Sequence, residues 1–274
     1  YRMFVLGLIG WGLLGAINAT PAAPLPYHHI LQRNIRGPKD AAALLDLRSG
    51  KIVATVRSDI LARRHRPGSV FKLITAATLL QLGRAEGAVT CHGKVQLLGK
   101  SLKCWQPKGH GRLTLERALA ESCNVYFYQR ATEIPADGLL SMAHAFGFGQ
   151  VTPFAQTSED SGLLPHSLSP HELVDAAVGD SDVIWVSGYQ LLYLAAQLSG
   201  ASRFPSRAPI RTDILRQAMR RAMQSGTGSK SPSRLPIAGK TGTARKSGSW
   251  RYQGWFVGFV PFQAPRYALV VYID

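Results

Sequence analysis

The most constraining feature of this sequence is a helix with apolar residues on nearly every side. Segment 70–82 reads VFKLITAATLLQL, and Lys72 is its only charged residue. A helix that is apolar all round is buried inside a domain, so the rest of the chain must pack around it. Pro67 and Gly68 supply a turn before it, and Ser69 stands at the helix start.

Ser69 and Lys72 form a candidate nucleophile and base. They are three positions apart, so a helix places the hydroxyl and the amine on one face. Burial disfavours an ammonium group, so a buried lysine can become a neutral amine that accepts the serine proton. Backbone N–H groups at the helix start favour the developing negative charge. A serine cap and a lysine that extends to solvent would give the same pattern, which leaves catalysis open.

The N-terminal segment predicts export. Residues 3–17 (MFVLGLIGWGLLGAI) are continuously apolar behind Arg2, and the small and proline-rich residues 18–26 follow. A length of about fifteen residues is short for a membrane span and typical of a signal peptide. An uncleaved anchor and a buried core helix are the alternatives. We therefore expect a signal peptide or membrane anchor with a short linker over 1–26, and the catalytic domain over 27–274.

The charge of the chain indicates an anionic partner. The formal net charge is +16 and the pI is near 10.2, and Arg63, Arg64 and Arg66 stand immediately ahead of Ser69. For an exported protein, nucleic acid is a poor candidate, whereas an anionic membrane face or an acidic wall polymer fits. The 274 residues are 46% hydrophobic, which suits one large domain or two interleaved lobes.

Strand patterns occur at both ends of the chain, and helical patterns lie between them. Residues 41–47 and 51–56 are apolar runs around a turn with glycine, which predicts a β-hairpin. Further strands are predicted near the C-terminus, and helices in the middle. The predicted strands are 236–245, 255–260 and 267–273, and the predicted helices are 113–131, 139–146, 190–198 and 211–224.

The cysteines leave two structural alternatives open. Cys91 and Cys104 could pair as a disulfide in an oxidising compartment. A metal site built from Cys91, His92, Cys104 and His110 is the alternative, although neither Cys-x-x-Cys nor His-x-x-x-His spacing is present. Cys123 has no evident partner, and we expect it to be buried filler.

Two further polar clusters could line a cleft. Triplet 122–124 (SCN) stands within the predicted helix 113–131 and could present a hydroxyl and an amide, or simply end a helix. Segment 240–243 (KTGT) lies in a strand pattern with two glycines. Such a strand can line a cleft and pair with an extended peptide, although a lysine can also protect an exposed edge strand from aggregation.

The three clusters together resemble one known family. Ser-x-x-Lys, Ser-x-Asn and Lys-Thr-Gly, in this order, are the signature of penicillin-binding proteins and class A β-lactamases. Over 41–274 the chain closely resembles the transpeptidase domain of a penicillin-binding protein, most like the class B, monofunctional kind. The segments that carry the resemblance are RPGSVFK at 66–72, GHG at 109–111, ESCNVYFY at 121–128, GTG at 226–228 and AGKTGTA at 238–244.

The resemblance implies the fold class. It is an α/β (α+β) fold of the β-lactamase and transpeptidase type, with a central antiparallel sheet. The sheet would use the hairpin at about 41–56 and the strands at about 236–273. A large helical lobe, at about 69–225, would be inserted between them, with the cleft where the sheet and the lobe meet.

The resemblance also implies the reaction. Ser69 would attack the D-Ala-D-Ala carbonyl of a wall stem peptide, Lys72 would accept its proton, and Ser122 would relay a proton to the leaving group. Backbone N–H groups of Ser69 and Thr243 would form an oxyanion hole. No metal or organic cofactor is expected. The implied catalytic residues are Ser69, Lys72, Ser122 and Lys240, and the implied substrate-binding residues are Asn124, Thr241, Gly242 and Thr243.

The expected partners are peptidoglycan stem peptides and β-lactam antibiotics, with a membrane glycan polymerase or another wall-synthesis protein as a candidate. We expect the protein in the periplasm or on the outer face of the cytoplasmic membrane. A D,D-transpeptidase and a D,D-carboxypeptidase are equally consistent with these residues. A serine β-lactamase and a catalytically silent sensor or scaffold are the alternatives. The missing Glu-x-x-Leu-Asn segment disfavours a class A lactamase, and the complete catalytic triplets disfavour a scaffold.

Overall fold

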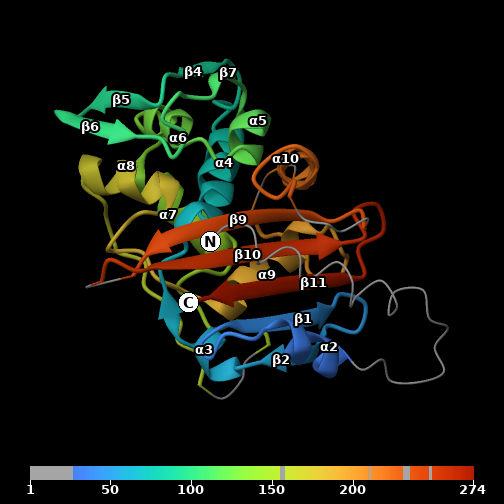
Figure 1. Cartoon of the computed structure of the whole chain (residues 1–274). Helices are drawn as coiled ribbons and strands as arrows, with labels where there is room; N and C mark the ends of the chain where they lie inside the picture. Colours follow the sequence, from blue (N-terminus) through green and yellow to red (C-terminus); the bar gives the residue numbers. More distant parts are fainter. Residues whose placement is uncertain (1–26, 155–157, 209, 211, 231–234, 247–248) are drawn as a thin grey trace.

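The computed structural model describes most of the chain after the N-terminal segment (Figure 1). The described residues are 27–154, 158–208, 210, 212–230, 235–246 and 249–274. The expected signal peptide or anchor, 1–26, lies outside them. Among the helices of the described residues, none combines the length and the apolar character that crossing a membrane requires.

A five-stranded antiparallel sheet forms the centre of the molecule, as the resemblance implied. Its order is β2-β1-β11-β10-β9, so the N-terminal hairpin adds to the C-terminal strands through the β1–β11 pair (Figure 1). Strand β10 begins before the predicted strand 255–260. The strands are β1 (Ala41–Asp46), β2 (Lys51–Val56), β9 (Ala238–Arg245), β10 (Tyr252–Val260) and β11 (Tyr267–Ile273).

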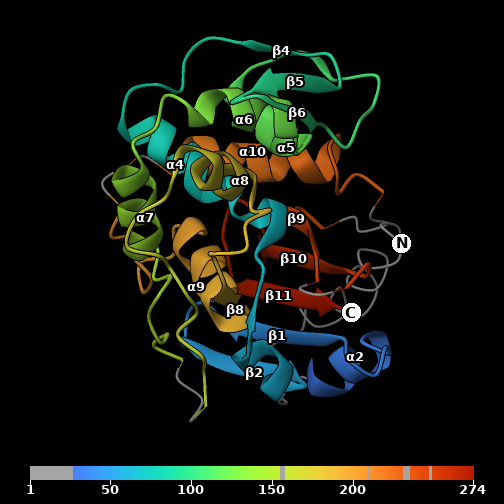
Figure 2. The same ribbon diagram turned by 90° about the vertical axis from the view of Figure 1, so that its left-hand side faces the viewer.

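Both faces of the sheet are covered, which explains why its central strands are apolar at nearly every position. In β1, Ala43 and Leu45 belong to the large core shared with the helical lobe. Ala42 and Leu44, which point the other way, pack in a second core with residues around α2 (Tyr27–Asn34). Figure 2 shows α9 against one side of the sheet and α2 near the other. Burial on two faces removes the alternation that a half-exposed strand would show.

Helix α4 runs through the middle of the helical lobe. Eight of its ten residues are buried, including Lys72, which confirms the expected buried helix. A 3-10 turn, η1 (Gly68–Val70), precedes it. The helices after α2 are α3 (Ser58–Ala62), α4 (Lys72–Gln81), α5 (Leu115–Ala120), α6 (Asn124–Ala131), α7 (Ala136–Ala145), α8 (Pro170–Val178), α9 (Gly188–Leu198) and α10 (Asp213–Gln224).

The predicted continuous helix over 113–131 is wrong, because the chain breaks into α5 and α6. Ser122, between them, has a φ of 55°, in the left-handed region that interrupts a helix. The Cys123 side chain then accepts a hydrogen bond from Tyr126 N and caps α6. Ser122 and Cys123 therefore form a sharp turn between the two helices, and Asn124 begins α6.

Helix α8 was not predicted, although its start carries a clear sequence signal. Ser169 and Glu172 form a reciprocal capping box, and Pro170 occupies the first helical position. A short antiparallel pair also joins β3 (Arg64–His65) to β8 (Val186–Ser187). Capping signals of this kind locate a helix start even where the surrounding residues look like a loop.

A small β subdomain extends from the helical lobe, between α4 and α5 (Figure 1). It consists of two separate two-stranded sheets with several exposed residues. Its strands are β4 (Val89–Cys91), β5 (Lys94–Leu97), β6 (Lys100–Lys103) and β7 (Gly111–Leu113). The apolar side chains of these strands, including Val95, Leu102 and Leu113, pack with the main core of the helical lobe and hold the subdomain there.

Candidate active site

Ser69 lies in the 3-10 turn η1, at the start of the buried helix and beside strand β9. Gly68 has a φ of 55°, and a Cβ built on it would lie 2.6 Å from the backbone O of Thr243. Only glycine permits both this conformation and this close approach. The Ser69 backbone is thereby placed next to strand β9, where the resemblance puts the oxyanion hole.

Lys72 joins the first and second motifs. Its side chain is 0% exposed, and its Nζ lies 3.1 Å from Ser69 Oγ and 3.3 Å from Ser122 Oγ. The amine also donates to the backbone O of Ser122 at 2.9 Å and to Oδ1 of Asn124. One buried amine therefore contacts both serine hydroxyls of the predicted site.

Lys240 brings the third motif to the same point. Its Nζ donates to Ser122 Oγ at 2.9 Å and to the backbone O of Thr241 at 2.8 Å. Lys240 is 0% exposed, and Ser122 is 5% exposed. The Ser122 hydroxyl therefore lies between two buried amines, a position from which it can pass a proton from one side of the site to the other.

The remaining residues of the third motif line the outer edge of the sheet. Strand β9 pairs only with β10, so its other edge is not paired within the sheet. A Cβ on Gly242 would lie 2.9 Å from Val70 Cγ2, so a side chain there would push β9 away from η1. Thr243 is exposed. An edge strand beside a nucleophile is a place where an extended peptide can bind.

Thr227 is a site residue that the sequence reasoning did not assign. It lies just after α10, within the Gly-Thr-Gly segment that contributes to the resemblance. Its hydroxyl contacts Thr241 Oγ1 at 2.7 Å. The two hydroxyls, together with Lys240, place donors on one side of the site. The Gly-Thr-Gly segment was the signal in the sequence that could have identified Thr227. Only the fold shows that Thr227 contacts the third motif.

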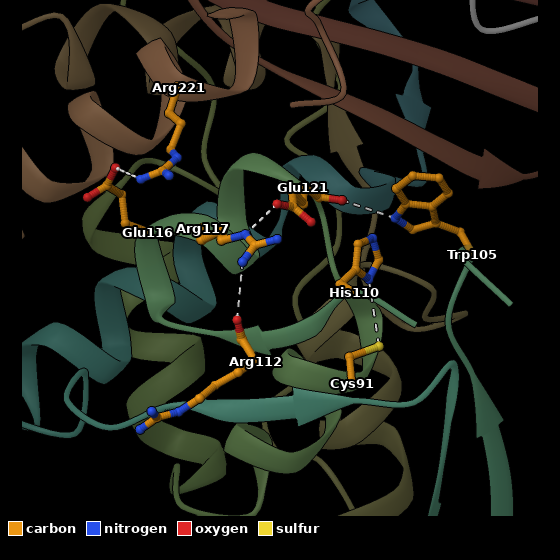
Figure 3. Close-up of polar contacts among 8 residues, drawn as sticks. All are labelled: Cys91, Trp105, His110, Arg112, Glu116, Arg117, Glu121 and Arg221. Atoms are coloured by element: carbon orange, nitrogen blue, oxygen red, sulfur yellow. Dashed lines mark hydrogen bonds and ion pairs between the residues drawn. The ribbon is translucent and has the colours of Figure 1, made fainter. Parts of the chain in front are cut away.

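Trp105 was also missed. Its Nε1 donates to the backbone O of Glu121 and of Ser122, at 3.1 Å each. Figure 3 shows Trp105 reaching Glu121, with His110 beside it. The indole thus supports the strained turn that carries the second motif. A lone tryptophan in a loop has no periodicity or spacing that could have identified it.

The predicted disulfide between Cys91 and Cys104 is not formed. Both cysteines and Cys123 are free and buried. The sulfurs of Cys91 and Cys104 instead contact Nδ1 of His110, at 3.6 and 3.5 Å, and the Cys104 and Cys123 sulfurs are 4.0 Å apart. The hydrogen bond with Cys123 lowers the pKa of the Cys104 thiol.

Cys91, Cys104, His110 and Cys123 make a candidate metal site different from the one weighed in the sequence. Each offers one ligand atom, and these atoms all lie within 4.8 Å of one another. His92 is exposed and does not belong to the group. Three sulfurs and one imidazole nitrogen are a donor set that suits Zn²⁺. Cys123 is buried, as expected, and it also belongs to this group.

Known proteins share both the sequence pattern and the fold. Residues 41–274 match the family model described as the penicillin binding protein transpeptidase domain. Peptidoglycan D,D-transpeptidase MrdA of Acinetobacter baumannii is 34% identical over 106 residues, which cover 37% of this chain and 16% of the relative. Peptidoglycan D,D-transpeptidase FtsI of Escherichia coli K12 is 26% identical over 277 residues, covering 85% of this chain and 46% of the relative.

A solved structure supports the same assignment of the fold. The complex between penicillin-binding protein PBP2 and MreC from Helicobacter pylori has a TM-score of 0.75 and 19% identity, and the match covers 86% of this chain and 56% of that one. The chain thus spans about half of FtsI and a smaller part of MrdA. The family model covers nearly all of the described residues, and the chain therefore belongs to the family of penicillin-binding protein transpeptidase domains.

Proposed function

We propose that this domain is a peptidoglycan D,D-transpeptidase that works through an acyl-enzyme on Ser69. The observation that carries the proposal is the position of Lys72 Nζ, within hydrogen-bond distance of the hydroxyls of both Ser69 and Ser122. The second amine, from Lys240, reaches the same Ser122 hydroxyl. The names of MrdA and FtsI, which are both peptidoglycan D,D-transpeptidases, support the choice of reaction.

In the acylation step, Lys72 takes the proton of Ser69 while Ser69 Oγ bonds to the carbonyl carbon of the penultimate D-alanine. Backbone N–H groups of Ser69 and Thr243 stabilise the oxyanion that forms. When the peptide bond breaks, Ser122 gives its proton to the leaving amine and receives a proton from Lys72. Terminal D-alanine then leaves as a neutral amine, and Ser69 holds the rest of the stem peptide as an ester.

In the second step, the amine of another stem peptide attacks the ester carbonyl. A new amide bond forms, the Ser69 ester bond breaks, and the proton lost by the amine returns to Ser69 through Lys72. The edge of β9 would hold the donor stem in an extended conformation. Thr241, Thr227 and Lys240 would bind its terminal carboxylate, because two hydroxyls and an amine lie together there.

Hydrolysis of the same acyl-enzyme by water would make the domain a carboxypeptidase. We favour transfer to an amine because the named relatives are transpeptidases. Purified protein should be incubated with a D-Ala-D-Ala pentapeptide, with and without an excess of an amine acceptor such as glycine amide. A cross-linked amide product that grows with acceptor concentration supports transfer, whereas release of D-alanine with no amide product would favour the carboxypeptidase.

Labelling with a fluorescent penicillin tests the nucleophile itself. We expect the wild-type protein to be labelled in a single tryptic peptide that contains Ser69, and Ser69→Ala to remain unlabelled. Ser49→Ala, in the β1–β2 turn, is the matched control and should label normally. An adduct on another residue, or undiminished labelling of Ser69→Ala, would overturn the assignment.

The β-lactamase alternative differs in the fate of the acyl-enzyme. We propose that the penicilloyl ester persists for minutes or longer, because the chain lacks the glutamate segment that class A enzymes use for deacylation. With nitrocefin in excess, a burst of about one equivalent per chain is the expected result. Sustained turnover of several equivalents per second would identify a lactamase instead.

We also propose that the protein works outside the cytoplasm, at the membrane surface, with residues 1–26 as signal or anchor. The net charge of +16 supports an anionic surface or wall polymer as its surroundings. A wall-synthesis partner is supported by analogy with the PBP2–MreC complex of Helicobacter pylori. Fusion of residues 1–40 to a reporter that is active only after export tests the location, and a reporter that stays inactive would contradict it.

A further inference from the structure

The hairpin formed by β5 and β6 carries a concentration of positive charge at the edge of the helical lobe (Figure 1). Residues 89–113, which form the β subdomain, contain five lysines and arginines and no aspartate or glutamate. In the register of the hairpin, Lys94 lies directly opposite Lys103. Like charges in such a pair repel each other and destabilise the two strands. A surface that keeps this pair, with no acidic residue in the same segment, indicates a negatively charged partner.

The two faces of the hairpin differ in chemistry. Its apolar side chains, such as Val95, pack against the main core and turn one face towards the helical lobe. Lys94 and Lys103 belong to the opposite face and are exposed. The other cross-strand pair on that face, Gln96 and Ser101, is uncharged. Among the described residues, neither lysine amine forms an ion pair or a hydrogen bond. We call this surface the lysine face.

Lys100, in the same hairpin, differs from these two lysines. It stands opposite Leu97, on the face that turns towards the lobe. It also interacts electrostatically with Asp175 of α8. The charge of Lys100 is therefore partly balanced by an acidic residue of the protein, whereas the charges of the lysine face are left for a partner.

The lysine face lies next to the second catalytic motif. The backbone O of Lys103 accepts a hydrogen bond from Nδ2 of Asn124 at 3.4 Å. Two residues further along the chain, Trp105 donates from Nε1 to the backbone O of Ser122 at 3.1 Å. The segment that carries Lys103 is therefore held beside the motif at two points. A substrate that lies against Asn124 and extends out of the cleft on this side reaches the lysine face.

We propose that Lys94 and Lys103 bind carboxylate groups of the donor stem peptide that precede its D-Ala-D-Ala end. This assignment rests on the proposed function, in which β9 holds the donor on one wall of the cleft and Asn124 contacts its amide on the other. An ammonium group on a long, flexible side chain can follow a carboxylate without a fixed geometry. The lysine face therefore selects donors by their charge, and the catalytic residues act on the D-Ala-D-Ala end alone.

Two donor peptides test this selection. One is the pentapeptide L-Ala-γ-D-Glu-L-Lys-D-Ala-D-Ala, and the other is the same peptide with the glutamate carboxylate converted to an amide. Release of D-alanine, with glycine amide as acceptor, gives kcat/KM for each. The wild type should prefer the free carboxylate, and Lys94→Gln and Lys103→Gln should each lower kcat/KM for that peptide by about two- to fivefold, mainly through KM. Added salt should weaken the preference.

Three controls separate substrate binding from a structural role. Lys100→Gln removes the same charge from the other face of the hairpin and should keep the preference. Benzylpenicillin has an uncharged side chain, so it should acylate all three variants at the wild-type rate. Lys94→Gln and Lys103→Gln should unfold at the wild-type temperature or above it, because repulsion between the two lysines is removed. Slower penicillin acylation, or an equal loss for both peptides, would overturn the proposal.

Binding to Ser69→Ala makes the test independent of turnover. Calorimetry should show tighter binding of the acidic peptide than of its amide, and Lys94→Gln combined with Lys103→Gln should remove the difference. If the wild type neither releases D-alanine nor is labelled by penicillin, the proposed function fails, and this binding difference still decides the role of the lysine face. Equal binding of the two peptides would overturn that role alone. Binding to anionic phospholipid vesicles that the lysine variants lose, without any peptide preference, would assign the face to a membrane surface instead.

Discussion

Lys72 of the first motif and Lys240 of the third motif are buried lysines that both contact the Ser122 hydroxyl. Each is 0% exposed, and each has a side-chain amine within 3.3 Å of Ser122 Oγ. The Ser122 hydroxyl is therefore within reach of two amines from different motifs. Lys72, which also contacts Ser69, is the amine in position to accept the Ser69 proton.

Lys72→Met should abolish most acylation and leave the fold intact. Methionine has a similar length and fills the buried space without a cavity, but it cannot accept the Ser69 proton. Loss of a general base lowers rates by about 10²–10⁴-fold. Stopped-flow labelling with a fluorescent penicillin measures the rate, and thermal unfolding checks the fold. Lys51→Met, on the exposed start of β2, is the control, and a normal rate in Lys72→Met would disprove the role.

Trp105→Phe should slow acylation while changing stability little. Phenylalanine keeps an aromatic ring against His110 but loses the N–H that binds the carbonyls of Glu121 and Ser122. A hydrogen bond of this kind contributes about 0.5–1.5 kcal/mol, so a reduction of up to about tenfold is expected. Trp250→Phe, at an 86% exposed position, should have no effect. An unchanged acylation rate in Trp105→Phe would show that the indole does not position the turn.

At the level of elements, the site depends on a close approach of η1 to the edge strand β9. The turn needs glycine at Gly68, and the strand needs glycine at Gly242, because each position faces the other element at less than 3 Å from a built Cβ. The approach places the Ser69 backbone and the Thr243 backbone side by side. Two separate N–H donors can aim at one oxyanion only when these elements are this close.

Gly68→Ala should therefore reduce the acylation rate far more than its loss of stability alone would explain. Its φ of 55° costs an alanine about 1–2 kcal/mol, and its Cβ would collide with Thr243 O. Gly83→Ala is a matched control, because Gly83 has a φ of 65° but nothing within 4 Å of a built Cβ. Urea unfolding should show a lower free energy of unfolding in both variants. Only Gly68→Ala should also lose acylation. Equal acylation rates in the two variants would show that acylation does not need the close approach of η1 to β9.

At the scale of the whole molecule, the sheet ties the two ends of the domain together. Ala43 of β1 pairs with Val270 of β11, so the hairpin cannot join its sheet until the C-terminal strands are made. The helical lobe is folded between these segments. His65 lies at this junction, with its ring 5.6 Å from Trp255 and 4.5 Å from Tyr272 of the sheet.

The burial of His65 makes the stability of the domain depend on pH. Desolvation lowers the pKa of His65 in the folded protein, and Lys246 and Arg63 lower it further. Below the unfolded value of about 6.5, the unfolded chain binds the proton first, so stability should fall as the pH is lowered from there towards the folded pKa. The contribution of His65 to stability should be fully present above about pH 6.5.

His65→Gln keeps a polar group near Ile60 O but does not titrate in this range. Compared with the wild type, the variant should lose less thermal stability between pH 7.5 and pH 5. Differential scanning calorimetry across this range measures the difference. Parallel curves for the two proteins would show that His65 does not contribute to the acid sensitivity.

The sequence by itself predicted the candidate chemistry of this protein, because each of its motifs is local. Ser69 and Lys72 lie one helical turn apart, and the apolar run after them can only be the centre of a domain. The apolar runs at the two ends of the chain, with the turn residues between them, predicted the hairpin and most of the C-terminal strands. Segments of this kind carry their structural signal within a few residues, so they can be recognised before any long-range contact is known.

Only the tertiary structure decided which distant groups meet. Cys123 joins Cys91, Cys104 and His110 because a left-handed turn at Ser122 aims its side chain at the β subdomain. Trp105 and Thr227 enter the site through contacts with the second and third motifs that no spacing predicts. A side chain's direction depends on backbone angles and on packing between remote segments, and neither is encoded in a short stretch of sequence.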